Sequence, residues 1–117
     1  MMKFYGYNQC TTCKKAKKFL EDRKILYDDF DITKNPPSKK LLNQILATGE
    51  YSIRQLFNTS GQLYREMNIK EKISELSQTE LLELLSQNGR LIKRPIITDG
   101  SKTTVGFNES QLKEKWK

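Results

Sequence analysis

The first residues of the chain show two hydrophobic periods in succession, one typical of a strand and one typical of a helix. From Met2 to Tyr7, Met2 and Phe4 alternate with Lys3 and Tyr5, which predicts a half-buried strand. After Cys10, apolar residues recur at spacings of three and four, which predicts an amphipathic helix. The buried face of that helix would carry Cys13, Ala16, Phe19 and Leu20.

Residues 26–32 return to an alternating pattern and predict a second strand. One side of this strand carries Leu26, Phe30 and Ile32. The other side carries Tyr27, Asp29 and Asp31.

The middle of the chain is predicted to be helical. After Pro36-Pro37, a helix capped by Ser38 ends at Gly49, and two short helical segments follow within residues 53–67. Ser77 and Glu80 have the spacing of a capping box, in which each side chain accepts a hydrogen bond from the other residue's backbone N–H. The leucine-rich helix behind this box ends at Gly89.

The C-terminal part of the chain predicts a hairpin and a last helix. The hairpin is predicted to have strands at Ile96–Thr98 and 103–107, joined at Asp99-Gly100. Asn108 is predicted to cap the helix that carries Leu112 and Trp116. Two strands separated by a helix pair in parallel, and a hairpin adds antiparallel strands. The prediction is an α/β, thioredoxin-like, mixed four-stranded sheet: one domain over residues 1–117, with a helical insertion at about 38–88.

The composition excludes several kinds of catalytic and metal site. The 117 residues include no histidine and two cysteines, Cys10 and Cys13. A Ser-His-Asp triad, a Cys-His pair and a His-ligated metal are therefore excluded. Two cysteines are also too few for a four-cysteine zinc site or a secreted disulfide framework. We expect no resident metal or cofactor.

The hydropathy of the chain predicts a cytoplasmic protein. No apolar run approaches the ~20 residues of a membrane helix, and residues 1–7 lack the pattern of a signal peptide. We therefore expect no membrane association. A close pair of cysteines in the cytosol is more often catalytic, redox-sensing or metal-binding than a structural disulfide.

The formal net charge of +7 is unevenly distributed. Residues 1–24 hold seven basic and two acidic side chains, and the excess comes mainly from the four lysines directly after the cysteines: Lys14, Lys15, Lys17 and Lys18. One interpretation is a solvated helix face. The other is a positive field that draws thiolates, oxyanions or an acidic protein surface towards Cys10. The stripe is short and has no nucleic-acid-binding motif, so we expect no direct nucleic-acid contact.

The motif C-T-T-C stands where the first strand ends and the first helix begins. At a helix N-terminus, unpaired N–H groups and the helix dipole stabilise an anion, so the Cys10 thiol should have a lowered pKa. Cys13 falls on the apolar face and would be the buried thiol that resolves a mixed disulfide on Cys10. The alternatives are two ordinary small hydrophobic residues, or half of a metal site shared between chains.

A second candidate element is Arg94-Pro95, directly before the third strand. In a thioredoxin-like sheet this loop lies opposite the helix N-terminus that carries the first cysteine, so Arg94 would stabilise the thiolate or an oxyanion and Pro95 would help to position a substrate. Asn8 could orient the thiolate through its amide donors. The alternative is a surface arginine beside a structural proline.

Four runs of residues resemble the arsenate reductase–Spx family: YGYNQCTTCKKAKKFL, FDITKNPPSKKLL, LIKRPIITDG and TVGFNES. The resemblance spans nearly the whole chain and implies a thioredoxin-like fold, with Cys10 as nucleophile and Arg94 as the arginine of the Arg-Pro-Ile motif. One branch of this family reduces arsenate with glutathione and glutaredoxin. In the Spx-type branch, the CxxC motif is a redox switch and the protein binds the C-terminal domain of the α chain of RNA polymerase.

The chain departs from the arsenate-reducing branch at two places. Where that branch uses two further arginines, this chain has Asn58 and Phe107. Each missing charge-assisted hydrogen bond costs about 1.5–3 kcal/mol, so we do not expect arsenate reduction by that route. Two functions stay open: a thiol–disulfide oxidoreductase re-reduced by thioredoxin, glutaredoxin or glutathione, and a redox-switched regulator of RNA polymerase. We expect a monomer.

Overall fold

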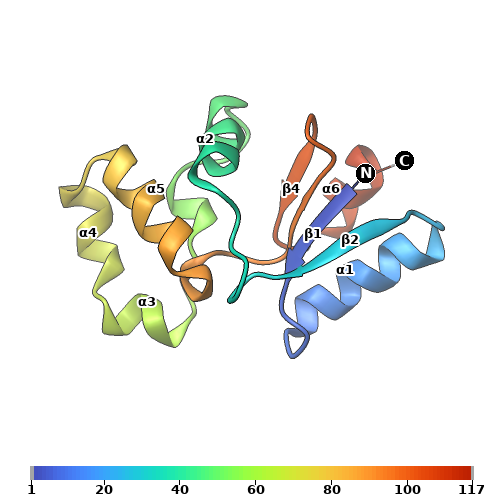
Figure 1. Cartoon of the computed structure of the whole chain (residues 1–117), viewed down its shortest axis with the longest axis horizontal. Helices are drawn as coiled ribbons and strands as arrows, with labels where there is room; N and C mark the ends of the chain where they lie inside the picture. The colour runs from blue at the N-terminus through green and yellow to red at the C-terminus, as the bar shows by residue number, and fades with distance from the viewer. Residues whose placement is uncertain (1, 117) are drawn as a thin grey trace. The chain divides into compact units, whose positions relative to one another are not determined.

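The computed structural model describes residues 2–116 and divides into two compact units (Figure 1). The first comprises Met1–Ile32 and Arg94–Lys117, and the second comprises Thr33–Lys93. The first unit holds all the strands, and the second holds most of the helices. The single domain with an insertion at about 38–88 stays a prediction.

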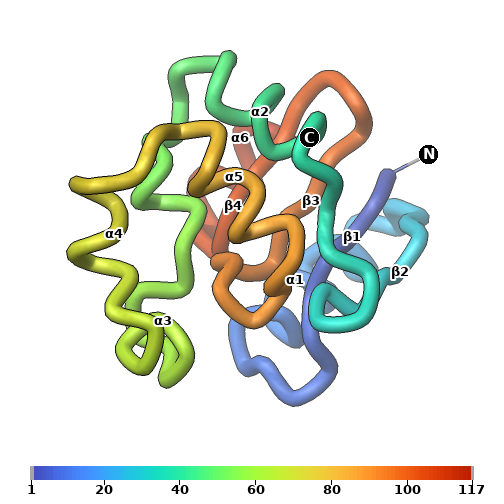
Figure 2. Tube along the Cα trace, turned by 60° about the vertical axis from the view of Figure 1, so that its left-hand side comes forward, coloured from blue at the N-terminus to red at the C-terminus, as the bar shows by residue number. Residues whose placement is uncertain are grey.

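The first unit is built on a mixed four-stranded sheet. Its strands are β1 (Met2–Gly6), β2 (Tyr27–Asp31), β3 (Ile96–Thr98) and β4 (Thr103–Val105). Their order is β2-β1-β3-β4, with β1 and β2 parallel and the other pairs antiparallel. β1 therefore lies between β2 and β3 (Figure 2). The predicted thioredoxin-like α/β sheet is confirmed.

Two helices pack on the same face of this sheet. They are α1 (Thr11–Asp22) and α6 (Glu109–Lys115). Phe4 of β1 pairs with Ile97 of β3, and both side chains enter the core between sheet and helices. That core consists of Phe4, Cys13, Ala16, Phe19, Leu20, Ile97, Leu112 and Trp116. The helix face predicted from the spacing of its apolar residues is confirmed, and each fully buried Leu or Phe contributes ~1.5–3 kcal/mol.

The last helix is held by a buried hydrogen bond as well as by its apolar side chains. The indole Nε1–H of Trp116 donates to Oγ1 of Thr104 at 3.1 Å, and Thr104 is fully buried. The predicted cap is present, because Asn108 Oδ1 accepts from the backbone N–H of Gln111 at 3.1 Å. A buried donor left without an acceptor would cost about 1–3 kcal/mol, so this bond fixes how α6 lies on the sheet.

The second strand begins one residue later than the sequence pattern predicted. Leu26 precedes β2 and is 77% exposed. Tyr27 pairs with Met2 instead and packs its ring against Phe4, with the ring centroids 5.4 Å apart. Phe30 faces the other way and stacks on Tyr5 at 5.1 Å. Both faces of β2 carry an aromatic ring, so alternation alone could not indicate which face meets α1.

The second unit consists of short helices. They are α2 (Lys39–Ala47), η1 (Arg54–Leu56), α3 (Gln62–Glu66), α4 (Ile69–Glu75), α5 (Gln78–Gln87) and η2 (Gly89–Leu91). Ser38 caps α2, and Ser77 and Glu80 form the predicted capping box of α5. The sequence pattern missed α4, which begins after Asn68 in the left-handed conformation (φ 55°) and buries Ile69. Within this unit α2 packs against α5.

Gly6 closes β1 at a position with no room for a side chain. A Cβ there would lie 2.5 Å from the ring of Phe4 and 3.1 Å from Sγ of Cys13. Both neighbours are buried, so neither can move aside easily. We expect Gly6→Ala to lower the free energy of unfolding by about 1–3 kcal/mol, as overpacking of a core does. Chemical denaturation measures the loss.

Leu26→Ala is the matched control for this prediction. The Leu26 side chain is exposed, so its truncation should change the free energy of unfolding by less than about 0.5 kcal/mol. Equal stability of Gly6→Ala and the wild-type protein would contradict the close packing of Phe4, Gly6 and Cys13.

Candidate functional site

Cys10 occupies the N-cap position of α1. β1 ends at Gly6, and the chain turns through residues 7–9, closed by a hydrogen bond from Cys10 N–H to the carbonyl of Tyr7 at 3.1 Å. Cys10 itself is extended (φ −88°, ψ 121°), and the first turn of α1 contains no acidic residue. The unpaired N–H groups of that turn therefore favour an anion at the Cys10 sulfur.

The Cys10 thiol is half-buried and acidic. Its Sγ lies 3.0 Å from Oγ1 of Thr12. Partial burial raises the pKa of this thiol, but hydrogen bonds from Thr12, from Cys13 and from Arg94 outweigh burial and lower the pKa to about 7. A free cysteine has a pKa of about 8.5. The predicted lowering of the Cys10 pKa therefore has side-chain causes as well as the helix N-terminus.

Cys13 lies one helical turn after Cys10 and, unlike Cys10, is fully buried. Its side chain is 1% exposed and belongs to the core beneath α1. Burial raises the pKa of the Cys13 thiol to about 12, although the backbone N–H of Tyr7 donates to its Sγ at 3.4 Å. The neighbouring Cys10 raises the pKa further. At neutral pH, Cys10 is therefore the ionisable thiol and Cys13 the protonated one.

Arg94 lies close enough to Cys10 to hydrogen-bond its thiol, and Pro95 follows it in the chain. Arg94 is half-buried, and its guanidinium carbon lies 5.5 Å from the centre of the Tyr7 ring, a cation–π contact. Its backbone carbonyl accepts a hydrogen bond from Thr12 at 3.4 Å. The Arg94–Pro95 peptide bond is cis, and Pro95 is buried. The carbonyl of Pro95 accepts from Gly106 N–H at 2.8 Å, which ties this loop to the end of β4.

Asn8 is exposed in the turn before Cys10. It borders a polar pocket of about 240 Å³ that is also lined by Gly6, Lys17, Asp29, Phe30 and Asp31. Lys17 forms an ion pair with Asp29 across this pocket, with 2.6 Å between Nζ and Oδ2. The pocket thus lies at the end of β1 and β2, next to the turn that leads to Cys10. A role for Asn8 in orienting the thiolate stays a prediction.

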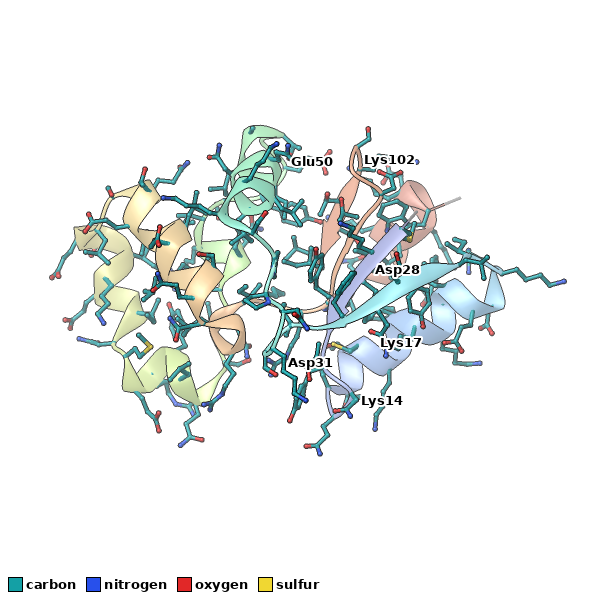
Figure 3. The ribbon with its side chains drawn as sticks, in the orientation of Figure 1. Lys14, Lys17, Asp28, Asp31, Glu50 and Lys102 are labelled. Carbon is teal, nitrogen blue, oxygen red and sulfur yellow. The ribbon has the colours of Figure 1, made fainter. Side chains whose placement is uncertain are left out.

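The lysine stripe of α1 is partly neutralised. Lys17 pairs with Asp29, and Lys18 pairs with Asp22 at 3.5 Å. Lys14 and Lys15 are exposed close to the start of the helix, and Figure 3 labels Lys14 and Lys17 on α1. The positive charge is therefore concentrated near the N-terminus of α1, as a field directed at Cys10 would require.

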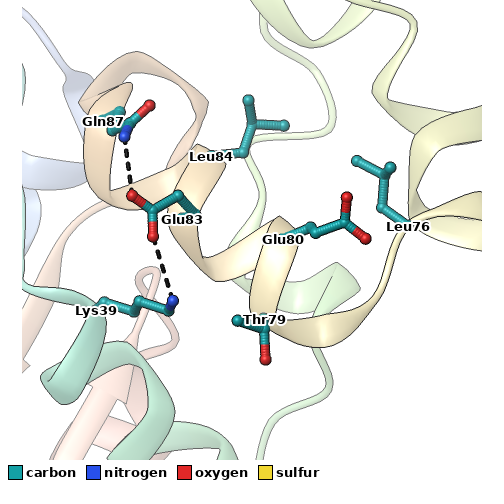
Figure 4. Close-up of a pocket in the computed structure, with 7 residues that line it drawn as sticks. All are labelled: Lys39, Leu76, Thr79, Glu80, Glu83, Leu84 and Gln87. Atoms are coloured by element: carbon teal, nitrogen blue, oxygen red, sulfur yellow. Dashed lines mark hydrogen bonds and ion pairs between the residues drawn. The ribbon is translucent and has the colours of Figure 1, made fainter.

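The second unit has a larger pocket of different chemistry. It measures about 370 Å³ and is lined by Lys39, Leu76, Thr79, Glu80, Glu83, Leu84 and Gln87 (Figure 4). Glu83 accepts from Lys39 at 3.2 Å and from Gln87 at 2.9 Å. This lining contains no thiol, and its Lys39 and Glu83 form an ion pair with each other. It holds none of the candidate site residues that the sequence predicted.

The two positions where arginines were expected in the arsenate-reducing branch have structural roles here. In the second unit, the backbone N–H of Asn58 donates to the carbonyl of Leu91 at 2.7 Å. In the first unit, Phe107 packs against the core beneath α1 and α6. Among residues 2–116, no group of three His, Cys, Asp or Glu side chains could hold a metal ion, and no helix is long and apolar enough to span a membrane.

Sequence reasoning missed two groups that contact the thiols. One is the Thr12 hydroxyl, and the other is the backbone N–H of Tyr7. The threonines inside the C-T-T-C motif were a sequence signal for the Thr12 contact, because residues at the start of the helix lie next to Cys10. No sequence signal marked the second, since every non-proline residue has an N–H.

Comparison with known proteins places the chain in a family. The sequence profile of the ArsC family matches residues 5–115. YusI of Bacillus subtilis is 48% identical over 97% of this chain and 96% of its own length, and the global transcriptional regulator Spx of Streptococcus agalactiae is 33% identical over 89% and 74%. The crystal structure of a possible arsenate reductase from Streptococcus mutans is 39% identical and superposes with a TM-score of 0.88 over 97% of this chain and 98% of its own. The chain belongs to the ArsC family.

Proposed function

We propose that this protein is a cytoplasmic thiol–disulfide redox protein in which Cys10 is the nucleophile and Cys13 the resolving thiol. The observation that carries the proposal is the contrast between the two thiols. The pKa of Cys10 is about 7 and that of buried Cys13 is about 12, although the residues are one helical turn apart. Membership of the ArsC family, with Spx among the relatives, supports a thiol redox or regulatory role.

The first step is attack by the Cys10 thiolate on a disulfide of the substrate. A sulfur–sulfur bond forms between Cys10 and one substrate sulfur, the substrate's own bond breaks, and the released thiolate takes up a proton. In the second step Cys13 loses its proton and attacks Sγ of Cys10. The Cys10–Cys13 bond forms, the mixed disulfide breaks and the second substrate sulfur leaves and is protonated. The substrate thus gains two electrons from the two cysteines and two protons, one released by Cys13 and one taken from solvent, which received it when Cys10 ionised.

The burial of Cys13 sets the order of these steps. Burial raises its pKa, so Cys13 stays protonated while Cys10 is free. The negative charge on Cys10 adds to this effect through a hydrogen bond and through repulsion. Once Cys10 is in a mixed disulfide that charge is gone, so the pKa of Cys13 falls and its attack becomes easier.

Arg94, Pro95 and Asn8 have supporting roles in this proposal. Arg94 stabilises the Cys10 thiolate or an anionic substrate, because its guanidinium lowers the Cys10 pKa from across the site. Pro95 shapes the loop that receives the substrate, and Asn8, which lines the pocket at the ends of β1 and β2, orients the thiolate. Thioredoxin, glutaredoxin or glutathione would reduce the Cys10–Cys13 disulfide to two thiols by the reverse exchange. In this proposal the protein acts as a monomer.

A second candidate function is a redox-switched transcriptional regulator. The observation that favours it is the 33% identity to a protein named global transcriptional regulator Spx. In this proposal the Cys10–Cys13 disulfide sets the affinity of the protein for the C-terminal domain of the α chain of RNA polymerase. Classical arsenate reduction is not part of either proposal, because Asn58 and Phe107 cannot supply the charge of two arginines.

The first function predicts the pH dependence of alkylation at Cys10. With a pKa of about 7, half of the Cys10 is thiolate at pH 7, whereas a free cysteine with a pKa of about 8.5 is only about 3% thiolate. The rate with iodoacetamide should therefore reach half of its maximum near pH 7. Cys10→Ser should abolish the fast reaction. A wild-type midpoint near pH 8.5, with no exchange between the protein and a model disulfide, would contradict the proposal.

The second function predicts binding that changes with redox state. Isotope-labelled protein titrated with that C-terminal domain of RNA polymerase α should show saturable NMR shifts whose midpoint differs between the reduced and the oxidised protein. Cys13→Ser cannot form the intramolecular disulfide, so its titration should be the same under both conditions. If the wild-type protein shows no NMR shifts in either redox state, the regulatory function is ruled out and thiol exchange remains as the proposed function.

A further inference from the structure

Thr12 lies between the reactive sulfur and the loop before β3. Its Oγ1 is 3.0 Å from Sγ of Cys10 and 3.4 Å from the backbone carbonyl oxygen of Arg94. A threonine hydroxyl carries one proton, so it can donate to only one of these two acceptors at a time. The second acceptor belongs to a segment 82 residues away along the chain.

We propose that the Thr12 hydroxyl is a one-proton switch, which donates to Cys10 when that sulfur is a thiolate and to the Arg94 carbonyl when the sulfur is protonated or disulfide-bonded. The inference rests on the proposed role of Cys10 as the nucleophile. Thr12 then stabilises the nucleophile before attack and is released from it by the reaction itself.

The chemistry of the two acceptors decides the direction of the switch. A thiolate is charged and accepts a stronger hydrogen bond than a neutral carbonyl oxygen does. A thiol or disulfide sulfur is a weak acceptor, so the carbonyl is then the better partner. Thr12 is also the first side-chain contributor to the lowering of the Cys10 pKa, which agrees with donation to the thiolate. Cys13 and Arg94 are the other groups that act on that pKa.

The switch links the redox state of Cys10 to the substrate loop. The carbonyl of Pro95, next to Arg94, is already held by Gly106 N–H at 2.8 Å. The structure, whose cysteines are free thiols, contains the bond from Thr12 to the Arg94 carbonyl, which joins α1 to that loop. A disulfide at Cys10 would keep this bond, and ionisation of the reduced thiol would release it. The disulfide and thiolate forms would therefore differ in how firmly the loop that receives substrate is held.

The test uses Thr12→Val, which keeps the shape of the side chain without the hydroxyl, and Thr12→Ser, which keeps the hydroxyl. Thr11→Val is the matched control, since Thr11 is an exposed neighbour in the same helical turn. We expect Thr12→Val to move the midpoint of Cys10 alkylation up by about one pH unit, with roughly tenfold slower alkylation below neutral pH. Thr12→Ser and Thr11→Val should keep the wild-type midpoint.

A second measurement follows the loop directly. The ¹³C shift of the Arg94 carbonyl should change between the reduced protein at alkaline pH and the oxidised protein, and this change should be lost in Thr12→Val. If Thr12→Val keeps the wild-type midpoint, or if Thr12→Ser behaves like Thr12→Val, the switch is wrong while the role of Cys10 stands. A wild-type midpoint near that of free cysteine would overturn the proposed function itself.

Discussion

The site depends on the packing of Cys13 in the core beneath the first turn of α1. Its sulfur lies in the core with Phe4, close enough to β1 that Gly6 has no room for a Cβ. The Tyr7 N–H points at the same sulfur. This close packing holds the first turn of α1 against β1. Because Cys10 is the N-cap of that helix, it is held at the edge of the core.

The two thiols owe their difference to this placement and not to the CxxC spacing as such. Desolvation acts on both, but it dominates at Cys13 and is outweighed by hydrogen bonds at Cys10. The donors that act on Cys10 come from α1 and from the loop at Arg94. A protein of this size without histidine can thus make one acidic thiol from a helix N-terminus and from the side chains of Thr12, Cys13 and Arg94, whose hydrogen bonds outweigh burial.

The charges of α1 set the positive charge near Cys10, and positions 58 and 107 carry uncharged side chains. The lysines later in the stripe are paired with Asp29 and Asp22, which leaves the positive charge close to the start of the helix. Phe107 packs against the core of the first unit. In the second unit, the backbone N–H of Asn58 donates to the carbonyl of Leu91. The chain therefore has a cysteine at the N-cap of α1 and the Arg94-Pro95 element, with uncharged residues at positions 58 and 107.

The parts of the fold that the sequence predicted depend on interactions between near neighbours. The cap at Ser38, the capping box at Ser77 and the apolar face of α1 each involve residues three or four positions apart, so their spacing alone indicates them. Leu26 lies outside β2 and is exposed, and because β2 has an aromatic ring on each face, only the register with β1 decides which face meets α1.

By itself, the sequence determined that this protein has a strand, a CxxC motif and a helix in that order, with Cys13 on the buried side and without histidine chemistry. Only the tertiary structure decided that Thr12 lies between Cys10 and the Arg94 carbonyl, and that the Tyr7 ring lies beside the Arg94 side chain. The physical reason is distance along the chain. Local periodicity reports contacts within one helical turn, whereas the sheet brings together residues that are more than 80 positions apart.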